Sequence, residues 1–348
     1  MSLNHMSDKQ IRKAKKWGDH RKDIEWPDIN GLGKERVEMI AFKHQLNDDF
    51  PIEFGKEDWK IIDFADRDKY KSKYYFQINV DKPSNVDEDG NTKDEVYEYI
   101  KNTGRPYLVC ELSAFRQNSY LGDPDNWYYT LGWFHFLRQG LFNNNNSRKD
   151  RWRRIQEQQS IELKPWRTEV RDNDYALICL QKATDSTLIP MHDTHGKYRN
   201  WLMIVINQIR NVYPYLPIVI RPHLKTKLGS YRNILGNIAG VTLSKTWEDR
   251  RFHEGGKGLQ EDLDGARFIV SYNSNVLTQA VLEGIPSICW DIRSAASPAC
   301  LDPSQLSNLE DVHEIDRTQW LHDLGYTQWS RAEIRNGRAW KHLNQYGF

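Results

Sequence analysis

The stretch RFIVSYNSNVLTQAVLEGIPSICWD, from Arg267 to Asp291, decides the fold class. An apolar run ends in a Ser-Tyr-Asn-Ser-Asn segment, an amphipathic helix follows, and a second apolar run begins after Gly-Ile-Pro. Short apolar runs that alternate with helices are typical of a parallel sheet whose two faces are covered by helices. The stretch therefore predicts a strand–helix–strand unit of an α/β protein.

The same alternation extends over most of the chain on both sides of this stretch. Strands are predicted in WKIIDFADR, YYFQINV and PYLVCELSAFR, and then in DYALICLQ and LPIVIRPH. The segment LKPWR precedes the region in which apolar strands and helices alternate most clearly. We therefore expect one domain over residues 1–165, a second over 166–312, and C-terminal helices over 313–348 that pack back across the domains. Within that tail, Ser330 and Glu333 have the spacing of a helix-capping box.

The composition is that of a polar globular protein. The 348 residues are 39% hydrophobic and 28% charged, with a net charge of +1. No apolar run approaches the ~20 residues that a membrane helix needs, so no membrane insertion is expected. The amino-terminal segment lacks the apolar core of a signal peptide and the four cysteines lack metal-ligand spacing, which favours a cytoplasmic location. A nucleic-acid partner would need a local basic patch, and residues 12–22 and 148–154 are candidates, or else solvated helix faces.

Polar residues that follow predicted strands are candidate site residues, because ligands of parallel sheets bind beyond the carboxyl ends of the strands. After the run LPIVI come Arg221, His223, Lys225 and Lys227, which place three cations and a histidine in one loop. Cations in such a loop would meet phosphate oxygens directly. The alternative is a solvated basic loop without a ligand.

The opening stretch supplies a second group of strand-end residues. Asn273, Ser274 and Asn275 stand where the helix begins, and the backbone N–H groups and dipole of a helix start favour an anion. The alternative is that Ser or Asn only caps the helix. Together with the basic loop, these residues predict a shared phosphate site. Asp291 ends the next strand and could contact sugar hydroxyls, or lie in a plain surface loop.

Several known site motifs are absent from the chain. It contains neither GxxxxGK[ST] nor GxGxxG, which disfavours a P-loop enzyme and the usual dinucleotide fingerprint. His192, Asp193 and His195 lie close together in MHDTH, but no further ligand is evident. No metal site is therefore expected.

The strand-end motifs resemble those of a known family. The R-P-H at 221–223, the S-N at 274–275, the Q-A at 279–280 and the G-I-P at 284–286 resemble the C-terminal half of GT-B glycosyltransferases, in their capsule-polysaccharide, Kdo-transferase-like branch. The resemblance covers roughly residues 175–298. It implies an α/β, GT-B-like fold of two Rossmann-like domains, whose parallel sheets face a cleft, with a C-terminal helical tail.

The resemblance also implies roles for individual residues. The family pattern is R-P-H-P after a strand and then S-x-x-x-x-E-A-L-x-x-G-x-P, and the serine-containing loop holds the phosphate of the donor. By resemblance that role passes to Ser274, Asn275 and His223, and to Lys225 or Lys227. The donor would be a nucleotide sugar, with a UDP-sugar as the expected class and no obligatory metal.

Two positions depart from the family pattern. Leu224 stands in place of the second proline, and Gln279 stands where the family often has a glutamate that binds the ribose or sugar of the donor. A glutamine still hydrogen-bonds hydroxyl groups, so Gln279 remains a donor-binding candidate.

A second likeness spans more of the chain. The order CELSAFR, DNWYYTLGW, LKPWR, RPH, YNSN and GIP is similar to glycosyltransferase-like proteins of tailed phages. Phages use such enzymes to decorate hydroxymethylated bases of their own DNA. The likeness therefore implies a 5-hydroxymethylpyrimidine base in DNA as the acceptor, and the host cytoplasm as the location.

Transfer of a sugar to a hydroxyl requires a base, and carboxylates near the predicted strand ends of the first domain are candidates. Glu111 is the first choice, followed by Asp63, Asp66 and Asp123, and each could instead be structural.

Contacts to the acceptor are expected from a cation and from aromatic rings that could stack on a flipped base or pack in the core. These residues are Arg116, Trp127, Tyr128 and Trp133. Two other functions remain open: a transferase that acts on a surface polysaccharide or lipid-linked glycan, and a non-catalytic nucleotide- or DNA-binding protein with the same fold.

Overall fold

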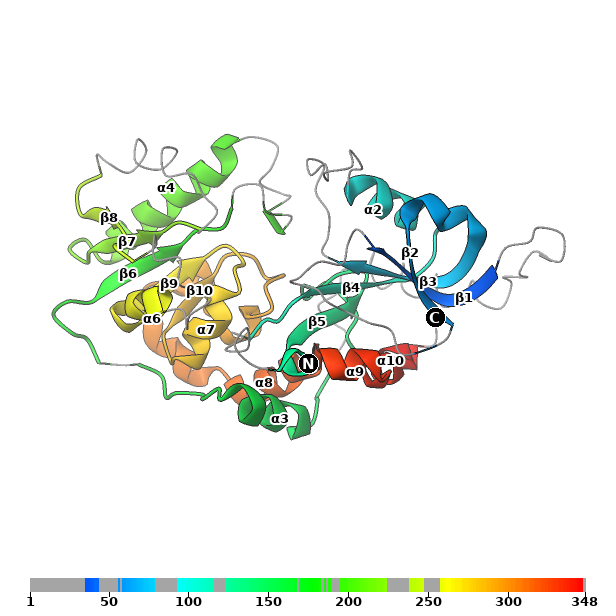
Figure 1. The fold of residues 1–348 in the computed structure, drawn as a ribbon. Coiled ribbons are helices and arrows are strands. Elements are labelled where there is room, and N and C mark those ends of the chain that lie inside the picture. The colour runs from blue at the N-terminus through cyan, green and yellow to red at the C-terminus, as the bar shows by residue number, and fades with distance from the viewer. Residues whose placement is uncertain are drawn as a thin grey trace. The chain divides into compact units, whose positions relative to one another are not determined.

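The computed structural model describes residues 35–43, 56, 58–78, 93–115, 123–167, 169–182, 185, 187–188, 195–223, 238–246 and 257–346. Two compact units make up the chain (Figure 1). Unit 1 comprises Met1–Ser113, Leu121–Arg154 and Leu321–Phe348, and unit 2 comprises Ala114–Tyr120 and Ile155–Trp320. The chain therefore enters unit 2 twice, after Ser113 and after Arg154, and returns each time to unit 1, where it ends.

The boundaries of the units differ from those expected after residues 165 and 312, which both lie inside unit 2. The segment around the expected boundary docks on unit 2, because the backbone N–H of Lys164 donates to the carbonyl of Leu282 at 2.8 Å. The N–H of Arg167 likewise donates to the carbonyl of Gly284 at 2.6 Å. The segment that contains Pro165 is therefore hydrogen-bonded to unit 2 on both sides of the proline, and we call it the strap.

Unit 2 is built on a parallel sheet. Its strands are β6 (Tyr175–Cys179), β7 (Ile218–Arg221), β8 (Val241–Leu243), β9 (Ala266–Ser271) and β10 (Ser287–Cys289). They lie in the order β10-β9-β6-β7-β8, and each pairing of neighbours in this order is parallel. The chain builds the sheet from β6 outward to β8, and then returns past β6 to add β9 and β10 on the other side. This reversal places a topological switch point between β6 and β9, where ligands of such sheets bind.

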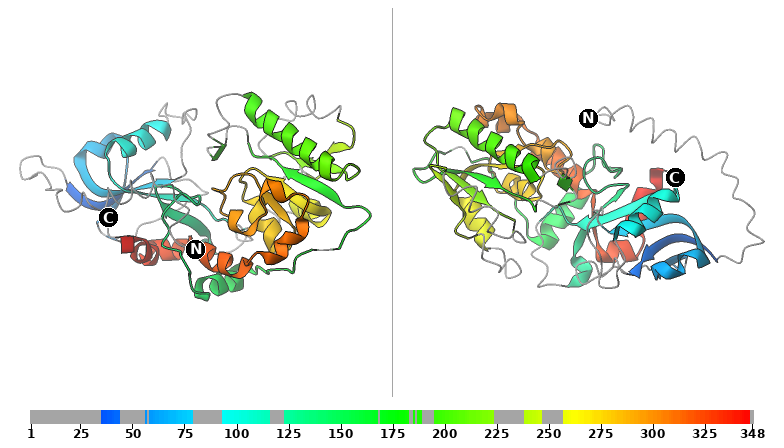
Figure 2. Two further views of the ribbon diagram at one scale, coloured as in Figure 1. Left: turned by 180° about the vertical axis from the view of Figure 1, so that it is seen from behind. Right: turned by 90° about the horizontal axis from the view of Figure 1, so that it is seen from above.

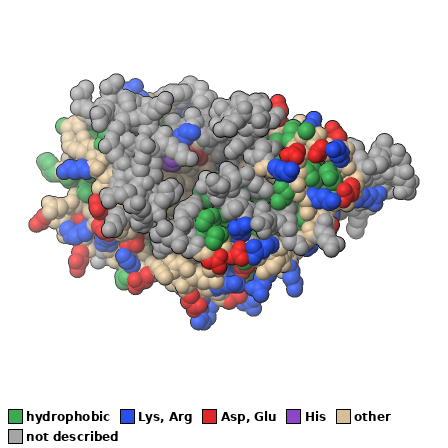
Figure 3. Space-filling view, in the orientation of Figure 1, with side chains coloured by type: hydrophobic (Ala, Val, Ile, Leu, Met, Phe, Trp, Pro, Cys, Tyr) green, Lys and Arg blue, Asp and Glu red, His purple; other side chains and the backbone are tan. Residues whose placement is uncertain are grey.

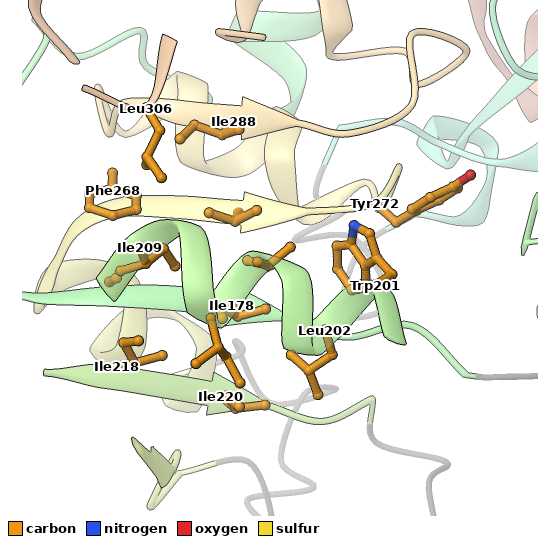
Figure 4. Close-up of a cluster of buried hydrophobic side chains, with 14 of the residues drawn as sticks. Ile178, Trp201, Leu202, Ile209, Ile218, Ile220, Phe268, Tyr272, Ile288 and Leu306 are labelled. Atoms are coloured by element: carbon orange, nitrogen blue, oxygen red, sulfur yellow. The ribbon is translucent and has the colours of Figure 1, made fainter. Parts of the chain in front are cut away.

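Helices cover both faces of this sheet (Figure 1). They are α4 (His195–Val212), α6 (Lys257–Asp264) and α7 (Val276–Leu282). α4 packs on one face, where Trp201, Leu202 and Ile209 point toward strand residues such as Ile178 and Phe268 (Figure 4). α6 and α7 cover the other face. Each fully buried side chain of this size contributes on the order of 1.5–3 kcal/mol, so the packing holds the strand ends in fixed positions.

Unit 1 is built on a mixed sheet. Its strands are β1 (Glu35–Phe42), β2 (Trp59–Ile62), β3 (Tyr70–Ile78), β4 (Tyr107–Leu112), β5 (Tyr128–Trp133) and β11 (Gln328–Ser330). They lie in the order β11-β5-β4-β3-β1-β2. The strands β1 to β4 pair in parallel, whereas β5 is antiparallel to both β4 and β11. The expected α/β class is confirmed for both units, and the antiparallel edge of unit 1 is an addition to the expected parallel sheet.

Helices also cover both faces of the unit 1 sheet (Figures 1 and 2). They are α2 (Lys93–Asn102), α9 (Arg331–Arg335) and α10 (Arg338–Leu343), while α3 (Asp150–Gln159) and α8 (Arg317–Gly325) each run across a boundary between the units. Val96 and Ile100 of α2 pack against one face with Ile40. Ile334 of α9 and Trp340 of α10 pack against the other. Short 3₁₀ helices complete the fold: η2 (Phe64–Lys69), η4 (Pro124–Asn126), η7 (Ser297–Ala299), η8 (Pro303–Gln305), η9 (Leu309–Glu314) and η10 (Asn344–Tyr346).

The C-terminal tail differs from the purely helical tail that was expected over residues 313–348. It contains α8, then strand β11, then α9 and α10, because residues 328–330 pair with β5. The predicted capping box is confirmed: Ser330 Oγ accepts from the N–H of Glu333 at 3.3 Å, and Glu333 Oε2 accepts from the N–H of Ser330 at 3.1 Å. Glu333 also forms ion pairs with Arg151 at 3.0 Å and Arg154 at 3.1 Å. Among the helices in the described ranges, none has the length and apolar character to cross a membrane.

Candidate functional site

A network of polar side chains joins the carboxyl ends of three strands at the switch point of unit 2. Gln181 follows β6, Asn273 follows β9 and Asp291 follows β10. Gln181 Nε2 donates to Asn273 Oδ1 at 2.8 Å, and the N–H of Asn273 donates back to Gln181 Oε1 at 3.2 Å. Asn273 Nδ2 then donates to Asp291 Oδ2 at 3.0 Å. The three side chains are buried and satisfy one another, so they fix the geometry of this edge.

The network continues from Asp291 to a cation. Arg293 Nε donates to both carboxylate oxygens of Asp291 at 2.9 Å, and Arg293 Nη2 donates to Oδ2 at 2.5 Å. Burial raises the pKa of the Asp291 carboxyl, but the hydrogen bonds from Arg293 outweigh burial and hold the pKa below its ordinary value. The Asp291 side chain is 8% exposed, whereas that of Arg293 is 30% exposed. Asp291 is therefore an ionised, enclosed anchor, and Arg293 is the member of the pair that reaches solvent.

Aromatic side chains support this edge from the α4 face. The Trp201 ring stacks on Tyr198 at 5.1 Å between centroids and meets the rings of Tyr272 and Trp290 edge to face at 5.7 and 5.9 Å. Figure 4 shows Tyr272 just beyond the arrowhead of β9, beside Trp201. Burial, and then the nearby Asp291 carboxylate, raise the pKa of the Tyr272 phenol. The ring cluster therefore brings a phenol close to the Asp291–Arg293 pair.

Ser274, Asn275 and Gln279 lie on or next to α7, as expected from their place after β9. Ser274 Oγ accepts from the N–H of Val276 at 3.3 Å, which is the local capping arrangement. Asn275 is exposed and makes no side-chain capping bond, and Gln279 is half-buried within the helix. The structure thus brings Ser274 next to the polar network, since Asn273 precedes it directly.

Arg221 lies at the same edge of the sheet, on the other side of β6. Cys179 pairs with Arg221 of β7 and with Ser271 of β9, so the two predicted strand ends flank a single residue. The guanidinium of Arg221 is buried and forms an ion pair with Asp262 of α6. It also donates to Thr246 Oγ1 at 3.0 Å.

The charge of Arg221 is therefore compensated within the protein, where it ties β7 to α6. This is a structural task that differs from the expected contact with a phosphate. His223 follows two residues later and is half-buried. Lys225 and Lys227 lie outside the described residues.

The carboxylates predicted as bases lie in unit 1 and differ in their surroundings. Glu111 is half-buried in β4, and its Oε1 accepts from the N–H of Leu112 at 2.8 Å. Asp63 follows β2 and pairs with Lys43 at 2.9 Å. Two carboxylates have local partners: Asp66 pairs with Lys69 at 2.7 Å, and Asp123 accepts from the N–H of Asp125 at 3.0 Å. Glu111 and Asp63 lie at the carboxyl ends of parallel strands, where a site residue is expected.

The aromatic residues predicted to contact an acceptor lie mostly in the core of unit 1. Tyr128 and Trp133 are fully buried, and Trp133 Nε1 donates to the carbonyl of Leu343 at 3.0 Å. Their ring faces are covered by protein, so stacking on a base would require them to leave the core. Trp127 is half-buried, and Arg116 lies outside the described residues.

The site residues predicted from the sequence did not include two members of the network, Gln181 and Arg293. Gln181 had a signal, because it is the first polar residue after the predicted strand DYALICL. Arg293 had one as well, since an Asp-x-Arg segment follows the strand that ends the opening stretch. No group of three or more His, Cys, Asp or Glu side chains in the described ranges is arranged to hold a metal ion. His192 and Asp193 of the MHDTH segment lie outside those ranges.

Comparison with known proteins gives structural similarity alone. No family model matches the chain, and no curated protein matches its sequence. Among solved structures, the chain is similar to the β-Kdo 2,4-transferase of KpsC from Thermosulfurimonas dismutans, with a TM-score of 0.47, 11% identity, and 73% of this chain and 79% of that chain covered. The β-Kdo 2,7-transferase of the same protein gives a TM-score of 0.43 and 12% identity, with 88% and 99% of the two chains covered. The UDP-bound MnaA of S. aureus gives 0.33 and 8%, with 90% and 96% covered.

Proposed function

We propose that the protein is a glycosyltransferase that moves a sugar from a nucleotide-sugar donor, with UDP as the expected nucleotide, to a hydroxyl acceptor. The observation that carries the proposal is the polar network at the switch point of unit 2. It consists of side chains that follow β6, β9 and β10, and it adjoins the Ser274 segment singled out by the family resemblance. In a parallel α/β sheet this is the place where nucleotides bind.

The proposed reaction assigns separate tasks to residues of the two units. The acceptor oxygen forms a bond to the anomeric carbon while the bond from that carbon to the donor phosphate breaks. The electron pair of the broken bond stays on the phosphate oxygen, and hydrogen-bond donors around Ser274 and the histidine at 223 stabilise that charge. The proton of the acceptor hydroxyl passes to a carboxylate of unit 1, with Glu111 as the first candidate and Asp63 as the second.

The acceptor that the sequence resemblance implies is a 5-hydroxymethylpyrimidine base in DNA. A feature that supports it is the basic segment that leads into α3, where the Arg148 side chain, two residues before the helix, is 84% exposed. The buried rings of Tyr128 and Trp133 do not support it. In Figure 3, basic and acidic side chains intermix along the lower edge of the described surface, where α3 lies in Figure 1. The experiment therefore includes a glycan hydroxyl as well as DNA among the acceptors.

The experiment incubates the full chain with a panel of nucleotide sugars and with three acceptors: hydroxymethylcytosine DNA, the same DNA with plain cytosine, and an oligosaccharide. Mass spectrometry of digested nucleosides and of the oligosaccharide detects transfer. We expect mass gain of one hexose or related sugar on a hydroxyl acceptor with at least one donor.

The matched variants are Glu111→Gln and Glu98→Gln, which remove one carboxylate charge each; Glu98 lies on α2 and pairs with Lys101 at 2.9 Å. We expect Glu111→Gln to lose at least 100-fold in rate, a loss typical of a general base, and Glu98→Gln to keep the wild-type rate. Binding of donor without any turnover would show the non-catalytic alternative to be correct. Failure to bind any nucleotide sugar would contradict the proposed function.

A further inference from the structure

The network at the switch point ends in a guanidinium that a carboxylate holds through two of its nitrogen atoms. Its members follow one another from Gln181 through Asn273 and Asp291 to Arg293. We propose that Arg293 binds the phosphate of the donor and is oriented for that task by Asp291. This inference rests on the proposed function, and it adds a phosphate-binding residue that the sequence motifs did not include.

The orientation of the guanidinium leaves one of its edges available. A guanidinium carries five N–H groups in a planar fork, which suits the oxygens of a phosphate. Asp291 engages Nε and Nη2. Among the residues that the structure describes, the guanidinium thus has acceptors for two of its five N–H groups. The Arg293 side chain is 30% exposed.

The loop that carries Arg293 is well fixed. The N–H of Arg293 donates to Asp291 Oδ1 at 3.0 Å, and Ser297 Oγ donates to the carbonyl of Ile292 at 2.7 Å. Trp320 Nε1 donates to the carbonyl of Ala295 at 2.9 Å. A phosphate-binding group that is held in place before the ligand arrives loses little freedom on binding.

Stability alone is a weak reason for this arrangement. An enclosed carboxylate paired with an arginine adds little net stability, because removing both charges from water offsets their attraction. A local hydrogen bond between the Arg293 N–H and Asp291 would close the turn without any guanidinium. The guanidinium bonds to Asp291, and the support of Asp291 by Asn273, fix the direction of the cation.

A matched arginine pair at the opposite edge of the same sheet provides the control. Arg171 precedes β6, and its Nε donates to Asp174 Oδ1 at 2.8 Å, while its N–H donates to Oδ2 at 2.8 Å. The Asp174 side chain is 3% exposed and that of Arg171 is 46% exposed. The pair therefore matches Asp291–Arg293 in chemistry and burial, but it lies at the amino-terminal edge, where no ligand is expected.

The experiment measures binding of UDP and of uridine by calorimetry to the full chain and to Arg293→Met, Arg293→Lys and Arg171→Met. Urea unfolding of each variant checks that it is folded. We expect Arg293→Met to raise the Kd of UDP by about 10- to 100-fold, in line with the loss of a hydrogen bond to a charged group. Arg293→Lys should give a smaller increase, and the Kd of uridine should stay unchanged. Arg171→Met should change the Kd of UDP by less than about twofold, because its side chain lies at the other edge.

A second measurement covers the case in which Arg293→Met does not fold. The arginine Nε–H resonance of Arg293, assigned by its loss in Arg293→Lys, should shift when UDP is added to the wild type and not when uridine is added. If the wild type binds UDP but neither the Kd nor this resonance responds, the role of Arg293 is overturned while the proposed function stands. If the wild type binds none of the nucleotides and transfers no sugar, both the role of Arg293 and the proposed function are overturned.

Discussion

The two edges of the unit 2 sheet use similar polar residues for different purposes. At the amino-terminal edge, Arg167 Nη1 donates to the backbone carbonyls of Leu263, Asp264 and Ala266 at 2.9–3.2 Å. Arg210 likewise donates to backbone carbonyls before β7 and β8. At the carboxyl-terminal edge, the described polar side chains mainly bond other side chains. The cations of the first edge satisfy helix and loop ends, whereas the network of the second edge orients donors toward the place where a ligand binds.

This comparison separates residues that hold the fold from residues that are aimed at a ligand. Substitutions at the amino-terminal edge should lower stability and leave nucleotide affinity unchanged. Substitutions in the network should lower affinity more than stability. Arg221 is an exception at the carboxyl-terminal edge. Its charge is paired with Asp262 inside the protein, as expected for a residue that stabilises the fold.

The largest effect is expected for Arg221→Met. The change leaves Asp262 buried without its cation, so the free energy of unfolding should fall by about 3–5 kcal/mol, measured by urea denaturation. The double variant Arg221→Met/Asp262→Leu should recover most of that loss, because it removes both charges. If Arg221→Met instead kept its stability and lost nucleotide affinity, Arg221 would belong to the ligand-binding group.

The next effect concerns the glycine turn before β10. Gly284 has φ of +74°, and an added Cβ would collide with the carbonyl oxygen of Pro165. Gly284→Ala should therefore lower the free energy of unfolding by about 2–3 kcal/mol. Gly240→Ala is the matched control: φ is +68°, but the added Cβ meets the flexible end of Arg210. We expect the control to cost about 1 kcal/mol, and equal losses would show that the strap at Pro165 is not rigid.

A smaller effect is expected for Asn273→Ala. The change removes the partner of Gln181 and one partner of Asp291, and it should lower the free energy of unfolding by about 1–3 kcal/mol. The Kd of UDP should rise as well, because Asp291 and Arg293 lose part of their support. An unchanged Kd in calorimetry, with the stability loss present, would assign the network to the fold alone.

The smallest effect is the pH dependence that Asp291 confers. The pKa of its carboxyl is lower in the folded protein than its ordinary value of 3.8. Its contribution to stability is therefore complete above about pH 4 and is lost as the pH falls through the folded pKa. Urea denaturation of the wild type and of Asp291→Asn should show a stability difference that narrows below pH 4. A difference that stays constant with pH would mean that Arg293 does not depend on the charge of Asp291.

Local sequence patterns predicted the α/β class and several individual features. The strands of unit 2 were predicted because their apolar runs are continuous and their helices amphipathic, and both signals are local. The Ser330–Glu333 capping box was predicted for the same reason, since its members are three residues apart. Asn273 and Asp291 were predicted to lie at the carboxyl edge of the sheet, because each comes just after the end of a predicted strand.

Features that depend on distant parts of the chain were not predicted. Arg221 was expected to meet a phosphate, but its partner Asp262 is 41 residues away. The strand β11 forms only because it pairs with β5, and three residues carry no strand pattern of their own. The rings of Tyr128 and Trp133 could have lain on the surface or in the core, and the burial of Trp133 depends on packing against distant residues such as Trp340.

Hydrogen exchange of the full chain, with and without saturating UDP, compares both edges of the unit 2 sheet in one measurement. We expect slower amide exchange at residues 271–276 and 291–297 when UDP is bound, with no change at residues 171–174 and 239–241. Protection confined to the amino-terminal edge, or exchange that UDP leaves unaltered at both edges, would show that UDP does not bind at the carboxyl-terminal edge.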